Sequence, residues 1–299
     1  MKRTVYLLSI LLVILIGTYL QYCYCCKSDV EQEEILINYE NKSLATFSVE
    51  AGDFKVESDD NFDFDKSSYK IRKPVSASVK ESIEQLRRYL VEDVNRVLKI
   101  RGYYAAFEEN TSIFPNLGLA RANAVKNYLR GEGINKKQLR VDDSQLTESL
   151  PDSVTIIKGA TAFELDLEDE NALLERIKSL RIFGEELQEE PIHLYFKTGE
   201  AHIHLSVKER EQIRKISEYL TQVDEAKLLI VGHTDNTGNR EMNIKLSKER
   251  ADFVKDYFIK NDFSTDAIET RGVGPDKPIA TNNTEEGRAK NRRVTLVLK

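Results

Sequence analysis

The order of strand-like and helix-like segments limits the fold of this 299-residue chain most, because the same order occurs twice. In each half an amphipathic helix is followed by an apolar strand that ends at glycine, a second helix with an Arg-Ala pair, and a further strand. The paired segments are 62–90 and 194–220, 97–104 and 227–234, 117–134 and 245–262, and 137–141 and 267–274. This alternation predicts an α/β fold (an α+β sandwich), with two βαβαβ domains whose helices pack on one mixed sheet.

The composition of the chain is typical of folded domains, since 40% of the residues are hydrophobic and 31% are charged. Between the two halves, leucine and isoleucine recur at helical spacing and predict a connecting helix. The predicted parts are a transmembrane anchor (1–26), a linker (27–45), a first domain (46–167), the connecting helix (168–189) and a second domain (190–299).

The N-terminal stretch has the pattern of a membrane anchor. Lys2 and Arg3 precede a mostly apolar segment, residues 4–26, and a bilayer core takes about 20 residues. We interpret this segment as an uncleaved single span with a cytoplasmic N-terminus. A cleaved signal peptide is the alternative. Because the span has no Asp, Glu, Lys, Arg or His, we expect an anchor and not an ion path.

The three cysteines, Cys23, Cys25 and Cys26, all lie at the end of this stretch. A disulfide framework needs cysteines that are spread through the fold, so both domains must rest on their apolar cores alone. We interpret the cysteines as residues at the membrane edge, and lipidation is the alternative.

The second half carries a series of motifs in a fixed order. They read YFKTGEAHI, IVGHTDNTG, NIKLSKERADFV, TRGVGPDKPIATN and EEGRAKNRRVTLVL. In this order and at these spacings they resemble the C-terminal OmpA-like domain, a peptidoglycan-binding module of bacterial envelopes. The first half resembles the same fold in a diverged form. The predicted span lies outside the resemblance, and together the two predict a single-pass inner-membrane protein with periplasmic domains. An outer-membrane associated protein, or one secreted to the periplasm after signal cleavage, is the alternative.

The ligand that this resemblance implies is the diaminopimelate group of the peptidoglycan stem peptide, whose free end carries an ammonium and a carboxylate. Asp235 follows a strand, where its carboxylate accepts from the ammonium. Arg250 lies in the next helix, where its planar guanidinium holds the carboxylate. Asn243 and Leu246 share that helix face and line the site. The predicted ligand-binding set is Thr234, Asp235, Thr237, Asn243, Leu246, Arg250, Arg292 and Arg293.

A purely structural role is the alternative for the same residues. Asp235 is then an Asx-turn or helix-cap residue, with Arg250 as its salt-bridge partner. A metal site has less support: His202 and His204 share one face of a strand, but a zinc site needs a third ligand. Because the G-x-S-x-G and HExxH motifs are also absent from the sequence, we predict no metal, no cofactor and no enzymatic activity.

The first half departs from the pattern at the residues that matter. When Gly102 is aligned with Gly232, Ala105 falls opposite Asp235. Arg121 matches Arg250, and we predict that it has lost its acidic partner. An arginine alone cannot hold both ends of a zwitterion, so we expect the first domain to be a spacer or a contact module for envelope proteins.

Taken with the resemblance, these features predict a protein that tethers the membrane to the cell wall by non-covalent peptidoglycan binding. The net charge of −6 argues against broad nucleic-acid binding. A periplasmic protein-interaction scaffold with an OmpA-like fold and no wall ligand is the alternative.

Overall fold

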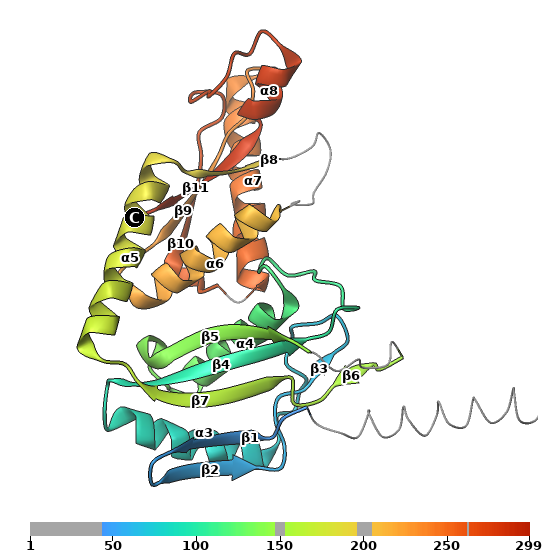
Figure 1. Ribbon diagram of the computed structural model, residues 1–299. Coiled ribbons are helices and arrows are strands. Elements are labelled where there is room, and N and C mark those ends of the chain that lie inside the picture. Colours follow the sequence, from blue (N-terminus) through green and yellow to red (C-terminus); the bar gives the residue numbers. More distant parts are fainter. Residues whose placement is uncertain (1–43, 147–152, 196–204, 262) are drawn as a thin grey trace, which may run out of the picture.

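The computed structural model describes residues 44–146, 153–195, 205–261 and 263–299 (Figure 1). The predicted anchor (1–26) and all but the last two residues of the predicted linker (27–45) lie outside these ranges. Within them, no helix combines the length and the hydropathy that crossing a bilayer requires. His202 and His204 also lie outside the described residues.

The N-terminal unit is built on a three-stranded sheet in the order β5-β4-β7. The central strand β4 is parallel to β5 and antiparallel to β7. A hairpin of β1 and β2 and a short pair of β3 and β6 complete the unit. Its elements are β1 (Phe47–Ala51), β2 (Phe54–Ser58), β3 (Phe64–Asp65), α3 (Ala77–Val91), β4 (Arg96–Tyr104), α4 (Leu117–Gly131), η2 (Lys136–Gln138), β5 (Leu139–Gln145), β6 (Ile156–Ile157) and β7 (Thr161–Leu167).

The two helices of this unit start where the sequence supplies a capping side chain. Ser76 accepts from the backbone N–H of Val79 and begins α3, and Asn116 accepts from that of Leu119 and begins α4. The apolar face of α3 contributes Ile83, among others, to a core that the sheet and α4 complete. Burial of this face stabilises the helix more than its intrinsic propensity does.

The C-terminal unit has a four-stranded sheet in the order β10-β9-β11-β8. Its central strand β9 is parallel to β10 and antiparallel to β11. A capping box of Ser206 and Glu209 starts α6, and Asn239 starts α7. The elements are α5 (Glu170–Glu189), β8 (Ile192–Tyr195), α6 (Val207–Gln222), β9 (Leu228–Gly232), α7 (Arg240–Lys260), η3 (Thr265–Ala267), β10 (Ile268–Gly272), α8 (Glu285–Asn291) and β11 (Arg293–Leu298).

The structure therefore has the mixed α/β character that the sequence predicts. The helix α5 covers the segment predicted to connect the halves. The helix α7 begins at Arg240, five residues before the expected start at 245, because the Asn239 side chain caps two backbone N–H groups there. The central strand, helix and parallel strand follow the same path in both units. Whether this similarity reflects a duplication stays a prediction.

A glycine in the last part of each central strand lets the following helix cross the sheet closely. A Cβ on Gly232 would lie 1.8 Å from the backbone oxygen of Ser247 in α7, and one on Gly102 would lie 2.0 Å from that of Gly118 in α4. Any other residue would push the helix away from the strand. Both strands thus carry a glycine at the crossing for the same steric reason, although β4 continues for two residues beyond Gly102.

The two units pack directly against each other (Figure 1). Ile113 and Phe114, which precede α4, belong to the same buried cluster as Ile216 and Phe258 of the C-terminal unit. The backbone N–H of Ile113 donates to Oδ1 of Asn261 at 3.2 Å. The C-terminal unit therefore completes its core with residues of the other unit.

Candidate functional site

The loop after β9 carries the carboxylate that the sequence singles out. The backbone N–H of Thr234 donates to the oxygen of Gly274 at 3.0 Å, which fixes the loop against the turn after β10. Oδ1 of Asp235 accepts from the backbone N–H of Thr237 at 2.9 Å. Asp235 therefore does form the Asx-turn of the structural alternative, but this contact uses only one of its oxygens.

The second oxygen of Asp235 faces an arginine. Nη1 of Arg292 lies 2.9 Å from Oδ2 of Asp235, and Nη2 of Arg292 lies 2.8 Å from Oε1 of Glu285. Burial favours the neutral acid, but hydrogen bonds from Arg292 and Thr237 outweigh it and lower the pKa of Asp235. Asp235 is therefore ionised over the physiological pH range.

Arg250 approaches the same loop from α7. Among the described residues its guanidinium makes one hydrogen bond, from Nη1 to the backbone oxygen of His233 at 3.3 Å. Burial lowers the pKa of Arg250, the nearby Arg292 lowers it further, and Asp235 raises it. A half-buried guanidinium with most of its five N–H donors unused is suited to bind an anion.

The first turns of α7 provide the polar and apolar sides of the site. Asn243 is buried, and its Nδ2 donates to the backbone oxygen of Thr237 at 2.9 Å, which ties the loop to the helix. One turn further along, the side chain of Leu246 is 41% exposed. Thr237 itself is exposed. The helix that carries Arg250 thus also presents an exposed apolar side chain.

Thr234 and Arg293 lie deeper than the rest of the predicted set. Both are buried, and within the part of the chain that the structure describes, Oγ1 of Thr234 has no hydrogen-bond partner. Arg293 donates from Nη2 to the backbone oxygen of Lys277 at 3.1 Å. The arginine that contacts Asp235 is therefore Arg292, and Arg293 supports the loop that follows β10.

Sequence reasoning missed two residues of this site. Glu285, the first residue of α8, holds Arg292 in place, and only the EEGR segment that starts this helix marks it in the sequence. His233 is buried behind the loop, and burial together with the charge of Arg293 lowers its pKa to about 3. The buried ring is therefore neutral and adds no charge to the site.

The prediction that Arg121 has lost its acidic partner is wrong. Its Nη1 lies 2.9 Å from Oε2 of Glu108, and neither side chain has any exposed surface. The sequence alignment places Ala105 opposite Asp235, but the carboxylate that contacts Arg121 belongs to Glu108, three residues further along the loop. The N-terminal unit therefore contains a closed ion pair where the C-terminal unit has an accessible arginine.

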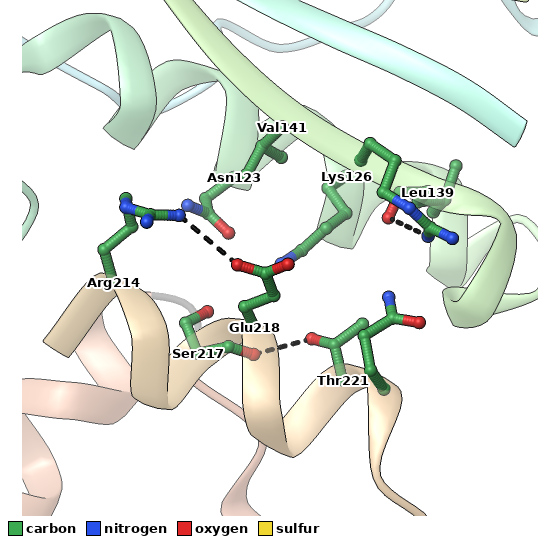
Figure 2. A pocket seen from close by; sticks show the side chains of 10 residues that line it. Asn123, Lys126, Leu139, Val141, Arg214, Ser217, Glu218 and Thr221 are labelled. Carbon is green, nitrogen blue, oxygen red and sulfur yellow. Dashed lines mark hydrogen bonds and ion pairs between the residues drawn. The ribbon is translucent and has the colours of Figure 1, made fainter. Parts of the chain in front are cut away.

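A hollow of about 160 Å³ lies between the units, away from this site (Figure 2). The Glu218 carboxylate lies between the side chains of Arg214 and Lys126 in this view. Nη1 of Arg214 is 3.4 Å from Oε2 of Glu218, and Arg140 pairs with Glu168 at 2.5 Å. Arg214 and Glu218 both belong to α6, and Glu168 directly follows β7 of the unit that contains Arg140, so neither ion pair joins the two units. Both arginines of the hollow already have carboxylate partners.

Comparison with known proteins identifies the family that the C-terminal unit resembles. Residues 195–292 match the model of the OmpA family, so this part of the chain is an OmpA-like domain. The resemblance predicted from the motifs is confirmed for these residues. The match to the family model does not extend to the N-terminal unit.

Two relatives in the curated proteins show how far the similarity extends. Peptidoglycan-binding protein ArfA of Mycobacterium tuberculosis is 44% identical over 88 residues, which are 29% of this chain and 27% of that protein. Outer-membrane lipoprotein YfiB of Pseudomonas aeruginosa is 40% identical over 94 residues, which are 31% of this chain and 56% of that protein. The chain thus spans only part of each relative.

A match to a solved structure covers a similar share of this chain. The peptidoglycan-associated lipoprotein from Burkholderia pseudomallei is 26% identical, with a TM-score of 0.32, and the match covers 36% of this chain and 89% of that one.

Among the described residues, no group of three or more His, Cys, Asp or Glu side chains is placed to hold a metal ion.

Proposed function

We propose that the C-terminal unit binds peptidoglycan without catalysis. The observation that carries this proposal is that an ionised Asp235, held by Arg292, lies near Arg250, whose N–H donors are mostly unused, at the end of β9. The OmpA family match and the relatives that are named for peptidoglycan binding support it. No catalytic family is indicated by these comparisons.

The proposed ligand is a stem peptide with a diaminopimelate group. A carboxylate offers about four lone-pair directions, and Asp235 uses two of them for Thr237 and Arg292. An ammonium can therefore bind Asp235 beside Arg292 without displacing it. The ligand carboxylate then pairs with the free N–H groups of Arg250, and Asn243, Leu246, Thr234 and Thr237 shape the walls. Arg293 acts from behind through the loop.

We propose further that residues 4–26 anchor the chain in the inner membrane, with both units in the periplasm. The protein then tethers the membrane to the cell wall. Envelope proteins of similar sequence, such as the lipoprotein YfiB, support the envelope location. Outer-membrane association, or secretion to the periplasm after cleavage of the N-terminal segment, is the alternative, and fractionation of cells that express the full-length chain separates these cases.

The same proposal includes the division of the chain into an anchor (1–26), a linker (27–45) and two domains (46–167 and 190–299), which residues 168–189 join. The shared path of strand and helix in the two units supports a duplication. The N-terminal unit is then the diverged copy, and it serves as a contact module.

Co-sedimentation of the full-length chain with purified sacculi tests wall binding. We expect Asp235→Asn and Arg250→Ala each to raise the Kd for sacculi at least tenfold, because each removes one charge-assisted contact of about 1.5–3 kcal/mol. Asp256→Asn and Lys260→Ala are the matched controls, since both are exposed on the same helix, α7. These controls should pellet like the parent.

A protein-interaction scaffold without a wall ligand is the second candidate. It is favoured if the parent does not pellet with sacculi. If both site variants pellet like the parent, wall binding uses other residues and the assignment of Asp235 and Arg250 is wrong. Circular dichroism of each variant excludes unfolding as the cause of lost binding.

A further inference from the structure

The close helix crossings allow single residues of the two units to be matched with each other. Gly102 faces Gly118 in the N-terminal unit as Gly232 faces Ser247 in the C-terminal unit. Three residues after each crossing point, the helix carries an arginine, Arg121 or Arg250. The structural register therefore makes these two arginines equivalent.

The same backbone contact confirms this equivalence. Nη1 of Arg121 donates to the backbone oxygen of Tyr103 at 2.8 Å, and Nη1 of Arg250 donates to that of His233 at 3.3 Å. Tyr103 directly follows Gly102, and His233 directly follows Gly232. Both guanidinium groups thus lie against the chain at the end of the central strand.

The two arginines differ in what occupies their remaining N–H groups. Arg121 holds the Glu108 carboxylate with both terminal nitrogens, at 2.9 and 2.5 Å. The backbone N–H of Ala105 donates to Oε2 of Glu108 at 2.9 Å, and that of Ser67 donates to Oε1 at 3.0 Å. An arginine and two backbone N–H groups therefore enclose this carboxylate.

We propose that Glu108 is a built-in occupant of a carboxylate site. Its carboxylate takes, on Arg121, the place that the carboxylate of a bound ligand takes on Arg250. The comparison with a ligand rests on the proposed function, whereas the occupation of Arg121 does not. The N-terminal unit is accordingly a closed form of the site, and it takes no wall ligand.

The binding of Glu108 to Arg121 also stabilises the loop that carries Glu108. Glu108 is tied to Arg121 of α4 and to Ser67 and Ala105, and its loop leads to Ile113 and Phe114, which enter the core of the C-terminal unit. A side chain in place of a diffusible ligand keeps this loop fixed at all times. The site that binds in one unit thus becomes a fixed support in the other.

Chemical rescue with acetate tests the proposal. Glu108→Ala removes a CH₂–COO⁻ fragment, which acetate matches in size and charge. In the full-length chain we expect this variant to lower Tm by roughly 10 °C, because it leaves a buried arginine unpaired. Sodium acetate should then restore more than half of the loss, and sodium chloride at equal ionic strength should not.

Two variants make the rescue specific. Glu108→Gln keeps the volume of the side chain and removes its charge, so its Tm should fall without a response to acetate. Adding Arg121→Leu to Glu108→Ala should abolish the rescue, because the cation that holds acetate is gone. Sacculus binding plays no part in these measurements, so failure of the rescue and failure of wall binding are distinguishable.

The proposal is overturned if Glu108→Ala melts like the parent or responds equally to acetate and chloride. Should the variant show no cooperative transition, refolding from urea in acetate and in chloride provides the same comparison. Equal refolding yields in the two salts then also overturn it.

Discussion

Single side chains at the end of β9 have structural roles and, under the proposed function, also bind the ligand. Asp235 closes an Asx-turn with one oxygen and pairs with Arg292 through the other. The turn aims the carboxylate, and the arginine keeps it ionised. The two readings of Asp235 that the sequence allows, turn residue and ligand residue, are therefore compatible.

His233, directly behind this carboxylate, makes stability depend on pH. Burial, together with the charge of Arg293, lowers the pKa of His233 to about 3 in the folded protein, from an ordinary value of about 6.5 in the unfolded chain. Since the unfolded chain binds the extra proton, stability is complete above pH 6.5 and falls as the pH drops towards 3. We expect a loss of at most about 1.4 kcal/mol per pH unit in this window.

Urea unfolding at about pH 7 and pH 5 measures this dependence. The variant His233→Gln cannot take up the proton, so its free energy of unfolding should change less between the two pH values than that of the parent. Equal changes in parent and variant would show that other groups cause the dependence.

At the scale of elements, the crossing of helix over strand decides which residues can face each other. The contact of Gly232 with Ser247 brings the first half of α7 over the end of β9. This brings Arg250 to the loop that carries Asp235. The site is therefore a result of how closely the helix approaches the sheet.

Replacing the glycine at this crossing should open the site and destabilise the unit. A Cβ at residue 232 would lie 1.8 Å from a backbone oxygen, so we expect Gly232→Ala to cost about 3 kcal/mol or more. Gly131→Ala is the control, because an added Cβ there meets none of the described atoms within 4 Å. It should be neutral or slightly stabilising. Urea unfolding of both variants checks this, and equal stabilities would contradict it.

At the scale of the whole molecule, the two units share a core. Phe114 is 2% exposed and packs in the cluster of the C-terminal unit, although it belongs to the loop before α4. By contrast, the Lys137–Asp224 pair across the same interface is largely exposed. Apolar packing therefore joins the units more strongly than their surface charges do.

Removing this shared side chain should uncouple the units. We expect Phe114→Ala to cost about 3–5 kcal/mol and to split one calorimetric transition into two, since each unit then unfolds alone. Lys137→Ala should cost less than about 1 kcal/mol and leave a single transition. A single transition in Phe114→Ala would mean that the remaining contacts are sufficient to couple the units.

The sequence predicts those features that depend on local pattern. Strand ends, helices and the placement of Asp235 and Arg250 on them follow from periodicity and motifs. The partners of Arg292 and Arg121 do not, because Glu285, Asp235 and Glu108 reach them only through tertiary folding. The packing of Ile113 and Phe114 in the C-terminal unit could not be predicted from the sequence either, since the sequence of a loop does not show which core its apolar residues enter.

The shared core has a mechanical consequence. A load on the loop after β9 passes into the sheet of the C-terminal unit and from there into Ile113 and Phe114. The helix α5 also links the units along the chain, so it shares the tension with the packed core. Under stretch the two units move as one body until the packed side chains separate, so the interface sets the force at which the molecule begins to extend.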